Sequence, residues 1–415
     1  MIARGDGTMS DGDALMDDSR FDIAIVGGGI HGAGCAQAAA AAGYRTLLLE
    51  RHSWAAQTSH YSSKLIHGGL RYLESAQFRL VYHALHERTR LLHNAPSLVR
   101  AVPFYIPVYR DTRRRPWQLR LGLSLYALLT GLQPLARFRQ LPRAAWRDIP
   151  GLRTDGLQAL FQYWDAQTDD AALTRAVVAS ATQLGAHCSE HSELLSAQTS
   201  VSAHANASAQ TTVSARANDS GFTLQLCVGE RQLRCHSRTV INAGGPWVGD
   251  IAQRCGATPL PFSLVKGSHL LLPASTLPGI LYLEAPRDGR AIFVMPWRGM
   301  TLVGTTEVEV DTPLVTASAD EIDYLLETVA HYLPQQSLDI IDSFAGVRVL
   351  PRSAERPFSR PREAVLQRDG NLLSIYGGKL TTYRHIAEQA IAELRPLLGA
   401  GAHAPIDTAT LRLDG

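Results

Sequence analysis

The segment FDIAIVGGGIHG, residues 21–32, decides the fold of this chain. Its apolar first half predicts a short buried strand, and the glycines that follow predict a tight turn into an alanine-rich helix ending near Gly43. The next apolar run, YRTLLLE at residues 44–50, predicts a second buried strand that ends on an acidic residue. Together these elements predict one βαβ unit.

Gly27, Gly29 and Gly32 have the spacing of a dinucleotide-binding turn. In such a turn the glycines let the backbone approach a pyrophosphate, and the N-terminus of the helix supplies N–H donors. Glu50, which ends the next strand, has the position of the acid that accepts a hydrogen bond from a ribose hydroxyl. The alternative is a mere tight turn, and the pattern itself fits NAD as well as FAD.

The composition limits what else the chain can be. Its 415 residues, 45% of them hydrophobic, suffice for two domains or one large α/β unit. The 40 basic and 38 acidic side chains nearly cancel, which argues against a general nucleic-acid binder. The chain has five cysteines but neither CxxC nor HExxH spacing, so we expect a reduced, cytoplasmic protein without a metal site.

Two later segments predict helices from local signals. Residues 170–184 carry a periodic apolar face, and Asp169 is well placed at the positive end of that helix. Ser318 and Glu321 have the spacing of a capping box before another apolar face.

Other segments predict strands, a loop and a tail. Residues 222–228 and 232–236 predict a β-hairpin. Residues 196–220 are almost all small and polar, which predicts a flexible surface loop. The polar N-terminus lacks the apolar region of an export signal and predicts a frayed tail. No apolar run reaches the roughly 20 residues that a spanning helix needs.

Five separated motifs, rich in glycine and hydroxyl side chains, follow in order along the chain. They are TSHYSSKLIHGGLRYLE (58–74), KGSH (266–269), GTT (304–306), GVR (346–348) and GGKLTTYR (377–384). In this order the motifs resemble the FAD-dependent glycerol-3-phosphate dehydrogenase family, within the D-amino-acid-oxidase-like flavoproteins. The resemblance extends from about Phe21 to Arg395, and many members carry a further helical domain beyond the matching region.

The resemblance implies an activity. It implies noncovalently bound FAD and the oxidation of sn-glycerol 3-phosphate to dihydroxyacetone phosphate, with hydride passing from C2 of the substrate to flavin N5. The electrons would then pass to quinone or oxygen. Two rivals stay open: a related flavin oxidase or dehydrogenase of a 2-hydroxy acid or amine, and a noncatalytic flavin-holding subunit of a membrane complex.

The resemblance also implies a fold, a doubly wound α/β FAD-binding domain with an inserted mixed-sheet α+β substrate domain. The expected FAD-binding segments are 20–84, 155–262 and 343–398. The expected substrate and membrane-facing segments are 85–154 and 263–342, with tails at 1–19 and 399–415.

The cofactor residues expected from the glycine pattern and the resemblance come from four parts of the chain. Residues 377–382 predict a strand-to-helix junction whose positive end would face the flavin edge that becomes anionic on reduction, although an ordinary glycine-rich helix start fits too. The expected cofactor residues are Gly27, Gly29, Gly32, Glu50, Thr58, Ser59, Ser63, Lys64, His67, Gly68, Gly378, Leu380 and Thr381.

A phosphorylated polyol substrate calls for planar, bidentate donors, which are arginines. The resemblance points to Arg71, Arg348 and Arg368, with Tyr72 beside them, although any one arginine is by default a solvated charge. Only three of the 40 basic residues are lysines, and all three fall inside the motifs. Of these, Lys379 is expected at the reacting end of the site together with Arg348.

Oxidation of a secondary alcohol needs a group that accepts the hydroxyl proton, and a neutral imidazole is suited to this. His269 is the expected base, because it matches the substrate-contacting histidine of the family. A satisfied structural histidine is the plainer interpretation. His67 is the alternative base, but its flanking glycines favour packing against the flavin.

Residues 110–147 contain nine arginines and one acidic residue around an apolar, aromatic stretch. Such a segment suits an anionic membrane surface, and a quinone-linked enzyme on the inner face of the cytoplasmic membrane would need one. The competing interpretation is a core-packed helix pair with solvated arginines.

Overall fold

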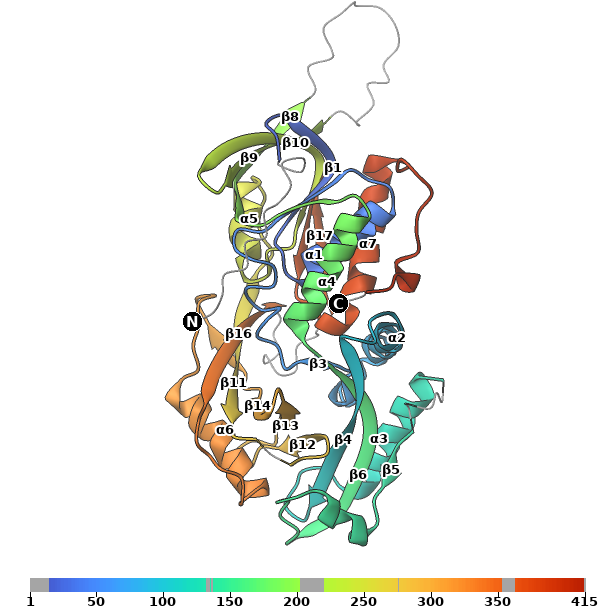
Figure 1. Ribbon diagram of the computed structural model, residues 1–415, viewed down its shortest axis with the longest axis vertical. Helices are drawn as coiled ribbons and strands as arrows, with labels where there is room; N and C mark the ends of the chain where they lie inside the picture. Colours follow the sequence, from blue (N-terminus) through green and yellow to red (C-terminus); the bar gives the residue numbers. More distant parts are fainter. Residues whose placement is uncertain are drawn as a thin grey trace, which may run out of the picture.

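The computed structural model describes residues 15–131, 135, 137–201, 220–274, 276–352 and 363–413. These residues form two large β-sheets, one in the upper and one in the lower half of Figure 1. In the described part of the chain, no helix is long and apolar enough to cross a membrane.

The first sheet contains the predicted βαβ unit. Strand β1 (Ser19–Val26) leads into helix α1 (Ile30–Ala41), and β2 (Thr46–Leu49) pairs parallel with β1. The remaining strands are β7 (His187–Ser189), β8 (Ser192–Val201), β9 (Ser220–Val228), β10 (Arg231–Asn242), β17 (Val365–Asp369) and β18 (Leu372–Tyr376). The order is β17-β18-β10-β1-β2-β7, with β8 and β9 continuing from β10, so β1 is central.

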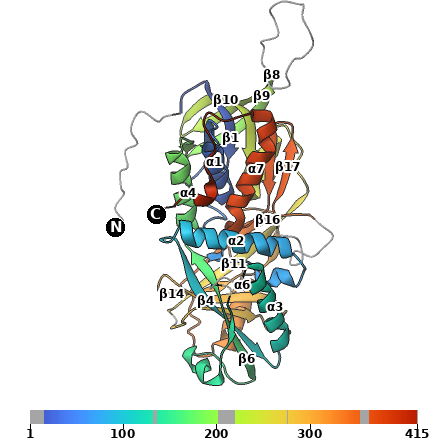
Figure 2. The ribbon, with the colours of Figure 1, turned by 90° about the vertical axis from the view of Figure 1, so that its right-hand side faces the viewer.

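Helices pack on both faces of this sheet, because consecutive residues of its strands point to opposite sides and both sets are apolar. On one face α1 lies between α4 (Asp170–Gln183) and α7 (Tyr383–Leu398), as Figure 2 shows. Every residue of α1 except His31 is buried, since its alanines allow close approach. The short helix α5 (Val248–Arg254) packs on the other face.

The second sheet lies between two apolar clusters. Its strands are β3 (Leu65–Ile66), β4 (Val99–Tyr109), β5 (Arg139–Gln140), β6 (Leu157–Thr168), β11 (Phe262–Leu272), β12 (Ile280–Glu284), β13 (Ala291–Trp297), β14 (Met300–Gly304), β15 (Val308–Val310) and β16 (Asp342–Pro351). Their order is β15-β11-β14-β13-β12-β4-β6-β3, with β16 on β11 and β5 on β6. Helix α6 (Ala319–Tyr332) covers one cluster, while α2 (Phe78–Asn94) and α3 (Pro116–Leu129) cover the other.

The predicted fold class is confirmed, and so are the locally signalled elements. Helix α4 begins beside its cap Asp169, whose carboxylate accepts a hydrogen bond from the N–H of Ala172. Ser318 and Glu321 form the capping box of α6. Strands β9 and β10 form the expected hairpin, in which Cys227 pairs with Gln232.

The expected domain boundaries assign β6 and β16 to the cofactor-binding segments, but the structure places both strands in the second sheet. Strand β6 pairs with β4 along almost its whole length, and β16 pairs with β11 from Phe262 to Leu271. Such long ladders join both strands to the second sheet, so the chain crosses between the sheets within segments 155–262 and 343–398.

Parts of the expected loop and tails are structured. Residues 196–201 extend β8 and pair with β9, because Ala197 continues the buried face of that strand. Residues 1–14 and 202–219 lie outside the described part of the chain, but Leu15 is buried. At the other end, the N–H of Ile406 donates to the carbonyl of Ala41 at 2.8 Å, which ties this segment to α1.

Candidate active site

A large cavity lies where the two sheets meet. Its wall takes in the turn between β1 and α1, the residues from Ala55 to Ser63, the turn around Arg71, and parts of β11 and β16. The segment 377–381 closes it. All five sequence motifs therefore line the cavity, and the motif at 304–306 does so through Thr305.

The glycines at one end of the cavity make room for a ligand and for close packing. Gly27 has φ +115°, and a Cβ on it would lie 2.5 Å from the carbonyl oxygen of Ala243. Gly29 caps the N-terminus of α1 and lines the cavity, whereas Gly32 lies behind the wall, where a Cβ would come within 1.8 Å of the Gly27 oxygen. Glu50 lines the cavity too, and its carboxylate accepts the Gly28 N–H at 2.7 Å.

Two further features show that the residues present fit a bound dinucleotide. Nδ1 of His31, in the first turn of α1, is buried without a hydrogen-bond partner among the described residues, and His31 lines the cavity. Burial lowers the pKa of His31 to about 4, so the imidazole is neutral at pH 7. Gly378 has φ +94°, and a Cβ there would lie 2.4 Å from Nε2 of His31. A glycine cradle, a positive helix end and an unsatisfied imidazole together suit a polar, anionic cofactor.

Hydroxyl groups of the 58–74 motif bind the turn to the second sheet. Ser59 Oγ accepts the N–H of Ile30 at 2.9 Å, and Thr58 Oγ1 donates to the carbonyl of Val347 at 2.6 Å. The N–H of His67 donates to Thr381 Oγ1 at 3.2 Å. Leu380 also lines the cavity. These predicted cofactor residues are therefore brought together.

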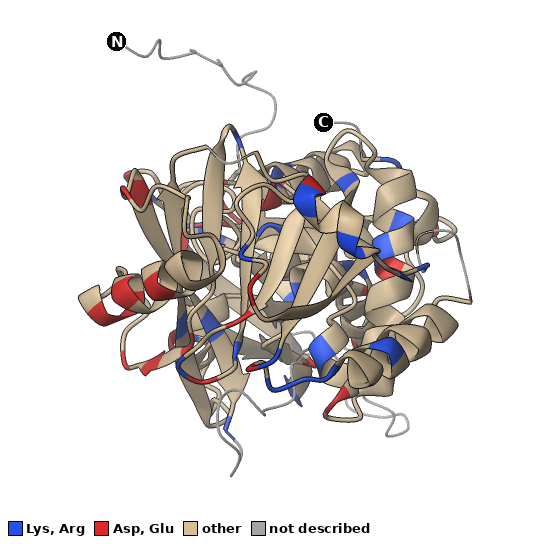
Figure 3. Ribbon diagram, turned by 90° about the horizontal axis from the view of Figure 1, so that it is seen from below, with Lys and Arg blue, Asp and Glu red and all other residues tan. Residues whose placement is uncertain are grey.

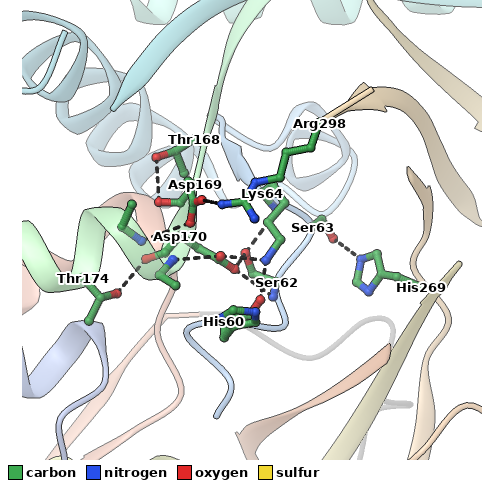
Figure 4. A network of polar contacts seen from close by, with 12 residues as sticks. His60, Ser62, Ser63, Lys64, Thr168, Asp169, Asp170, Thr174, His269 and Arg298 are labelled. Carbon is green, nitrogen blue, oxygen red and sulfur yellow. Dashed lines mark hydrogen bonds and ion pairs between the residues drawn. The ribbon is translucent and has the colours of Figure 1, made fainter. Parts of the chain in front are cut away.

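Lys64 takes a different place from the one expected. Its ammonium lies 2.7 Å from Oδ1 of Asp170, and both side chains are buried away from the cavity wall (Figure 4). Asp170 also accepts from the N–H and hydroxyl of Ser62. Lys64 thus fastens the motif to the N-terminus of α4, where a carboxylate is favourable. The second lysine, Lys266, pairs likewise with Glu321 at 2.6 Å.

Cationic side chains converge around Glu307 and Tyr72 at the cavity wall. Nη1 of Arg348 donates to Oε1 of Glu307 at 3.3 Å, and Nη2 of Arg71 lies 3.8 Å from the same oxygen. The ammonium of Lys379 lies 3.5 Å from the centre of the Tyr72 ring. Burial lowers the pKa of Arg348 to about 10, which still leaves it charged at pH 7. Sequence reasoning missed Glu307, although it directly follows the GTT motif.

His269 lies just behind the cavity wall. Its Nε2 is 3.0 Å from the hydroxyl oxygen of Ser63, which does line the cavity, and its ring stacks on Phe344 (Figure 4 shows the Ser63 contact). Burial lowers its pKa to about 3, with Arg348 and Lys64 adding to the shift. The imidazole is therefore neutral at pH 7.

Two other expected residues are placed outside the wall. Arg368 lies on the edge strand β17, exposed, with Nε 3.8 Å from the carboxylate of Glu393. Gly68 is buried beneath the wall, with its N–H on the hydroxyl of Tyr126. Within the described residues, no three His, Cys, Asp or Glu side chains are grouped to hold a metal ion.

Comparison with known proteins places this arrangement among flavoproteins. The family model of FAD-dependent oxidoreductases matches residues 22–384. A glycerol-3-phosphate dehydrogenase of Pseudomonas aeruginosa is 37% identical over 400 residues, which are 91% of this chain and 72% of that protein. D-erythritol 1-phosphate dehydrogenase of Brucella abortus is 35% identical over 90% of this chain and 73% of its own. The crystal structure of glycerol-3-phosphate dehydrogenase from Bacillus halodurans with FAD superposes with a TM-score of 0.73 at 25% identity, covering 96% of this chain and 68% of that one.

Proposed function

Since the chain belongs to the family of FAD-dependent oxidoreductases, we propose that it oxidises sn-glycerol 3-phosphate to dihydroxyacetone phosphate. One observation carries the proposal: Arg71, Arg348 and Lys379 line the same cavity as a dinucleotide-binding turn. Such a cavity brings an anionic substrate and a flavin into one enclosed space.

The three cations define the anion that the site takes. Two guanidinium groups and an ammonium suit a phosphate dianion, because guanidinium donors pair bidentately with its oxygens. Glu307 holds Arg348 and Arg71 toward the cavity. A polyol without phosphate would leave these half-buried arginines with Glu307 as a counter-charge and add no charge of its own, so phosphate should dominate recognition.

Bound FAD supplies the two-electron oxidant for C2 of the substrate. Gly27, Gly29 and Glu50 would hold its dinucleotide part, while His67, Gly378 and Thr381 would enclose its ring system. The resemblance of these segments to flavoproteins and the unsatisfied His31 imidazole support this placement.

The alcohol proton needs an acceptor when C2 is oxidised. Ser63 lies on the cavity wall, and its hydroxyl is within hydrogen-bond distance of the neutral His269 imidazole. We assign His269 as the base and Ser63 as the hydroxyl through which the proton reaches it.

A longer polyol phosphate is the second candidate substrate. The relative from Brucella abortus is named for D-erythritol 1-phosphate and is 35% identical to this chain, against 37% for the glycerol-3-phosphate dehydrogenase of Pseudomonas aeruginosa. The cationic clamp would serve either phosphate ester, so the room left for the carbon chain must decide between them.

The surface of α3 supports contact with an anionic membrane. Trp117, Leu121 and Leu128 are 66%, 65% and 63% exposed and lie along one side of the helix, while its other side is buried. Arg113, Arg115 and Arg120 are exposed beside them. Figure 3 shows red acidic residues concentrated at the left and more blue basic residues toward the right. Peripheral binding through α3 would give access to a lipid-soluble quinone as acceptor.

Anaerobic mixing of the FAD-loaded protein with polyol phosphates tests the proposal. Glycerol 3-phosphate should bleach the flavin absorbance rapidly, and glycerol should not. Faster bleaching by erythritol 1-phosphate would establish the second candidate. Bleaching only by a 2-hydroxy acid or an amine, or by none of these compounds, would refute the phosphate-ester assignment.

A further inference from the structure

Tyr126, on the buried side of α3, stands at the centre of a chain of hydrogen bonds. Its hydroxyl oxygen accepts the N–H of Gly68 at 2.9 Å, and its hydroxyl donates to Oδ2 of Asp165 at 2.6 Å. The other carboxylate oxygen of Asp165 accepts from Nη1 of Arg88 at 2.6 Å. Tyr126, Asp165 and Arg88 are all buried, at no more than 2% exposure.

The direction of these hydrogen bonds is fixed. A carboxylate that pairs with Arg88 can only accept, so the tyrosine hydroxyl must donate to it. Burial, reinforced by Asp165, raises the pKa of Tyr126 well above its ordinary value, and the hydroxyl therefore keeps its proton. A lone pair of the Tyr126 hydroxyl oxygen is therefore free to accept the Gly68 N–H. The ion pair thus orients a neutral hydroxyl, which in turn holds a backbone N–H.

The contact leaves the Gly68 backbone little freedom to shift. A Cβ on Gly68 would lie 2.5 Å from the tyrosine oxygen and 2.5 Å from a methyl group of Leu85, so this residue is pressed against α2 and α3. Its neighbour His67 lines the cavity. Gly69, with φ +78°, then caps the short turn Leu70–Leu73 that carries Arg71.

We propose that Tyr126 is a positioning residue, which acts through the Gly68 backbone to hold Arg71 where it meets the substrate phosphate. The identity of the anion rests on the proposed function. The positional argument rests only on the contacts of Gly68, Tyr126, Asp165 and Arg88. Without the hydroxyl, the Gly68 N–H and the Asp165 carboxylate both lose a buried partner, so the turn that follows loses its fixed register.

The test compares Tyr126→Phe with Tyr332→Phe in the FAD-loaded protein. Tyr332 is a matched control, because it is also buried and its hydroxyl also donates a hydrogen bond, to the carbonyl of Glu284 at 2.7 Å, in the other apolar cluster. We expect Tyr126→Phe to raise KM for glycerol 3-phosphate about tenfold and to change kcat less than about twofold, because Arg71 binds ground state and transition state alike. Tyr332→Phe should change neither.

Hydrogen exchange supplies a readout that needs no substrate. The Gly68 amide should exchange faster in Tyr126→Phe than in wild type, and Tyr332→Phe should leave it protected. If glycerol 3-phosphate fails to reduce the wild-type flavin, the proposed function is wrong. Hydrogen exchange at Gly68 still tests whether the Tyr126 hydroxyl holds the Gly68 backbone. Unchanged Gly68 protection, or an unchanged KM in an active enzyme, would overturn the proposal.

A second variant covers the case in which Tyr126→Phe does not fold. In Gly68→Ala the added methyl group would collide with the Tyr126 hydroxyl, so the loop at residue 68 must shift. Tyr126 itself is unchanged and keeps its hydrogen bond to Asp165. A raised KM with kcat nearly unchanged is expected again. A folded Gly68→Ala protein with wild-type KM would contradict the positioning role.

Discussion

The hydroxyl oxygen of Ser63 lies 3.0 Å from Nε2 of His269, and it is Ser63 that faces the cavity while His269 lies behind it. The base that we propose at His269 would therefore meet the substrate through the Ser63 hydroxyl. For this reason we expect substitutions of Ser63 as well as of His269 to slow flavin reduction.

We expect His269→Gln to slow flavin reduction by roughly 10²- to 10⁴-fold, the range for loss of a positioned base, while FAD stays bound. Ser63→Ala should slow it too, and the double variant should be little slower than His269→Gln alone. Anaerobic stopped-flow absorbance measures these rates, with His331→Gln on α6 as the control. Reduction of His269→Gln at the wild-type rate would move the base to Lys379 or to water.

The buried imidazole also makes stability depend on pH. The pKa of His269 is about 3 in the native protein and 6.5 as the ordinary value, so between these values only the unfolded chain binds the proton. The free energy of unfolding therefore falls as pH decreases from 6.5 toward 3. Above pH 6.5 the stabilisation by the neutral His269 imidazole is fully present. At about 1.4 kcal/mol per unit, the wild type should lose about 2 kcal/mol at pH 5 that His269→Gln keeps. Denaturant unfolding at pH 7 and pH 5 checks this, and equal losses in both proteins would contradict it.

Arg348→Lys should raise KM and lower kcat/KM for glycerol 3-phosphate by about 5- to 150-fold, equivalent to about 1–3 kcal/mol, because lysine keeps the charge but loses the paired donors. Arg368→Lys is the matched control, since Arg368 lies exposed on β17. Steady-state kinetics of both variants, with glycerol 3-phosphate and with glycerol as substrates, measures these changes in KM and kcat/KM. Equal kcat/KM for glycerol and its phosphate would refute the clamp.

Glu50→Ala should weaken FAD retention and leave turnover of the fully loaded enzyme within about threefold, because this carboxylate lies at the dinucleotide end. The variant also removes the acceptor of the Gly28 N–H. Glu230→Ala, in the exposed turn between β9 and β10, is the control. The flavin-to-protein absorbance ratio after purification is the measurement, and an undiminished ratio would count against Glu50.

Leu121→Gln should weaken sedimentation with anionic phosphatidylglycerol vesicles, and replacing Arg113, Arg115 and Arg120 by Gln should weaken it further. Each arginine near such a surface contributes about 1 kcal/mol, and added salt should reduce binding steeply. Leu314→Gln is matched to Leu121→Gln, because Leu314 is 69% exposed outside α3. If all variants sediment like wild type, the docking face is refuted and a soluble acceptor or oxygen is favoured.

Local patterns predicted the elements of this fold well, because their causes lie within a few residues. The glycine turn, the Asp169 cap and the capping box at Ser318 and Glu321 each depend on neighbours in sequence. The extent of β8 was missed, because its last residues are held by a ladder to β9 and composition alone indicated a loop.

Side-chain contacts between segments far apart in the chain could not be predicted from the sequence. Lys64 and Arg368 were expected in the site, yet Asp170 and Glu393 meet them elsewhere. Nothing near Tyr126 in sequence indicates its contact with Gly68, since α3 was seen only as a basic, apolar segment. On that segment the structure divides the apolar residues into a buried and an exposed face.

The cavity is assembled from contacts that close very large loops of chain. Ser63 meets His269 across 206 residues, Thr58 meets Val347 across 289, and His67 meets Thr381 across 314. Because closing such loops costs chain entropy, we expect the cavity to be complete only when the whole chain has folded. FAD should then bind only the completed fold and raise the melting temperature of both sheets together.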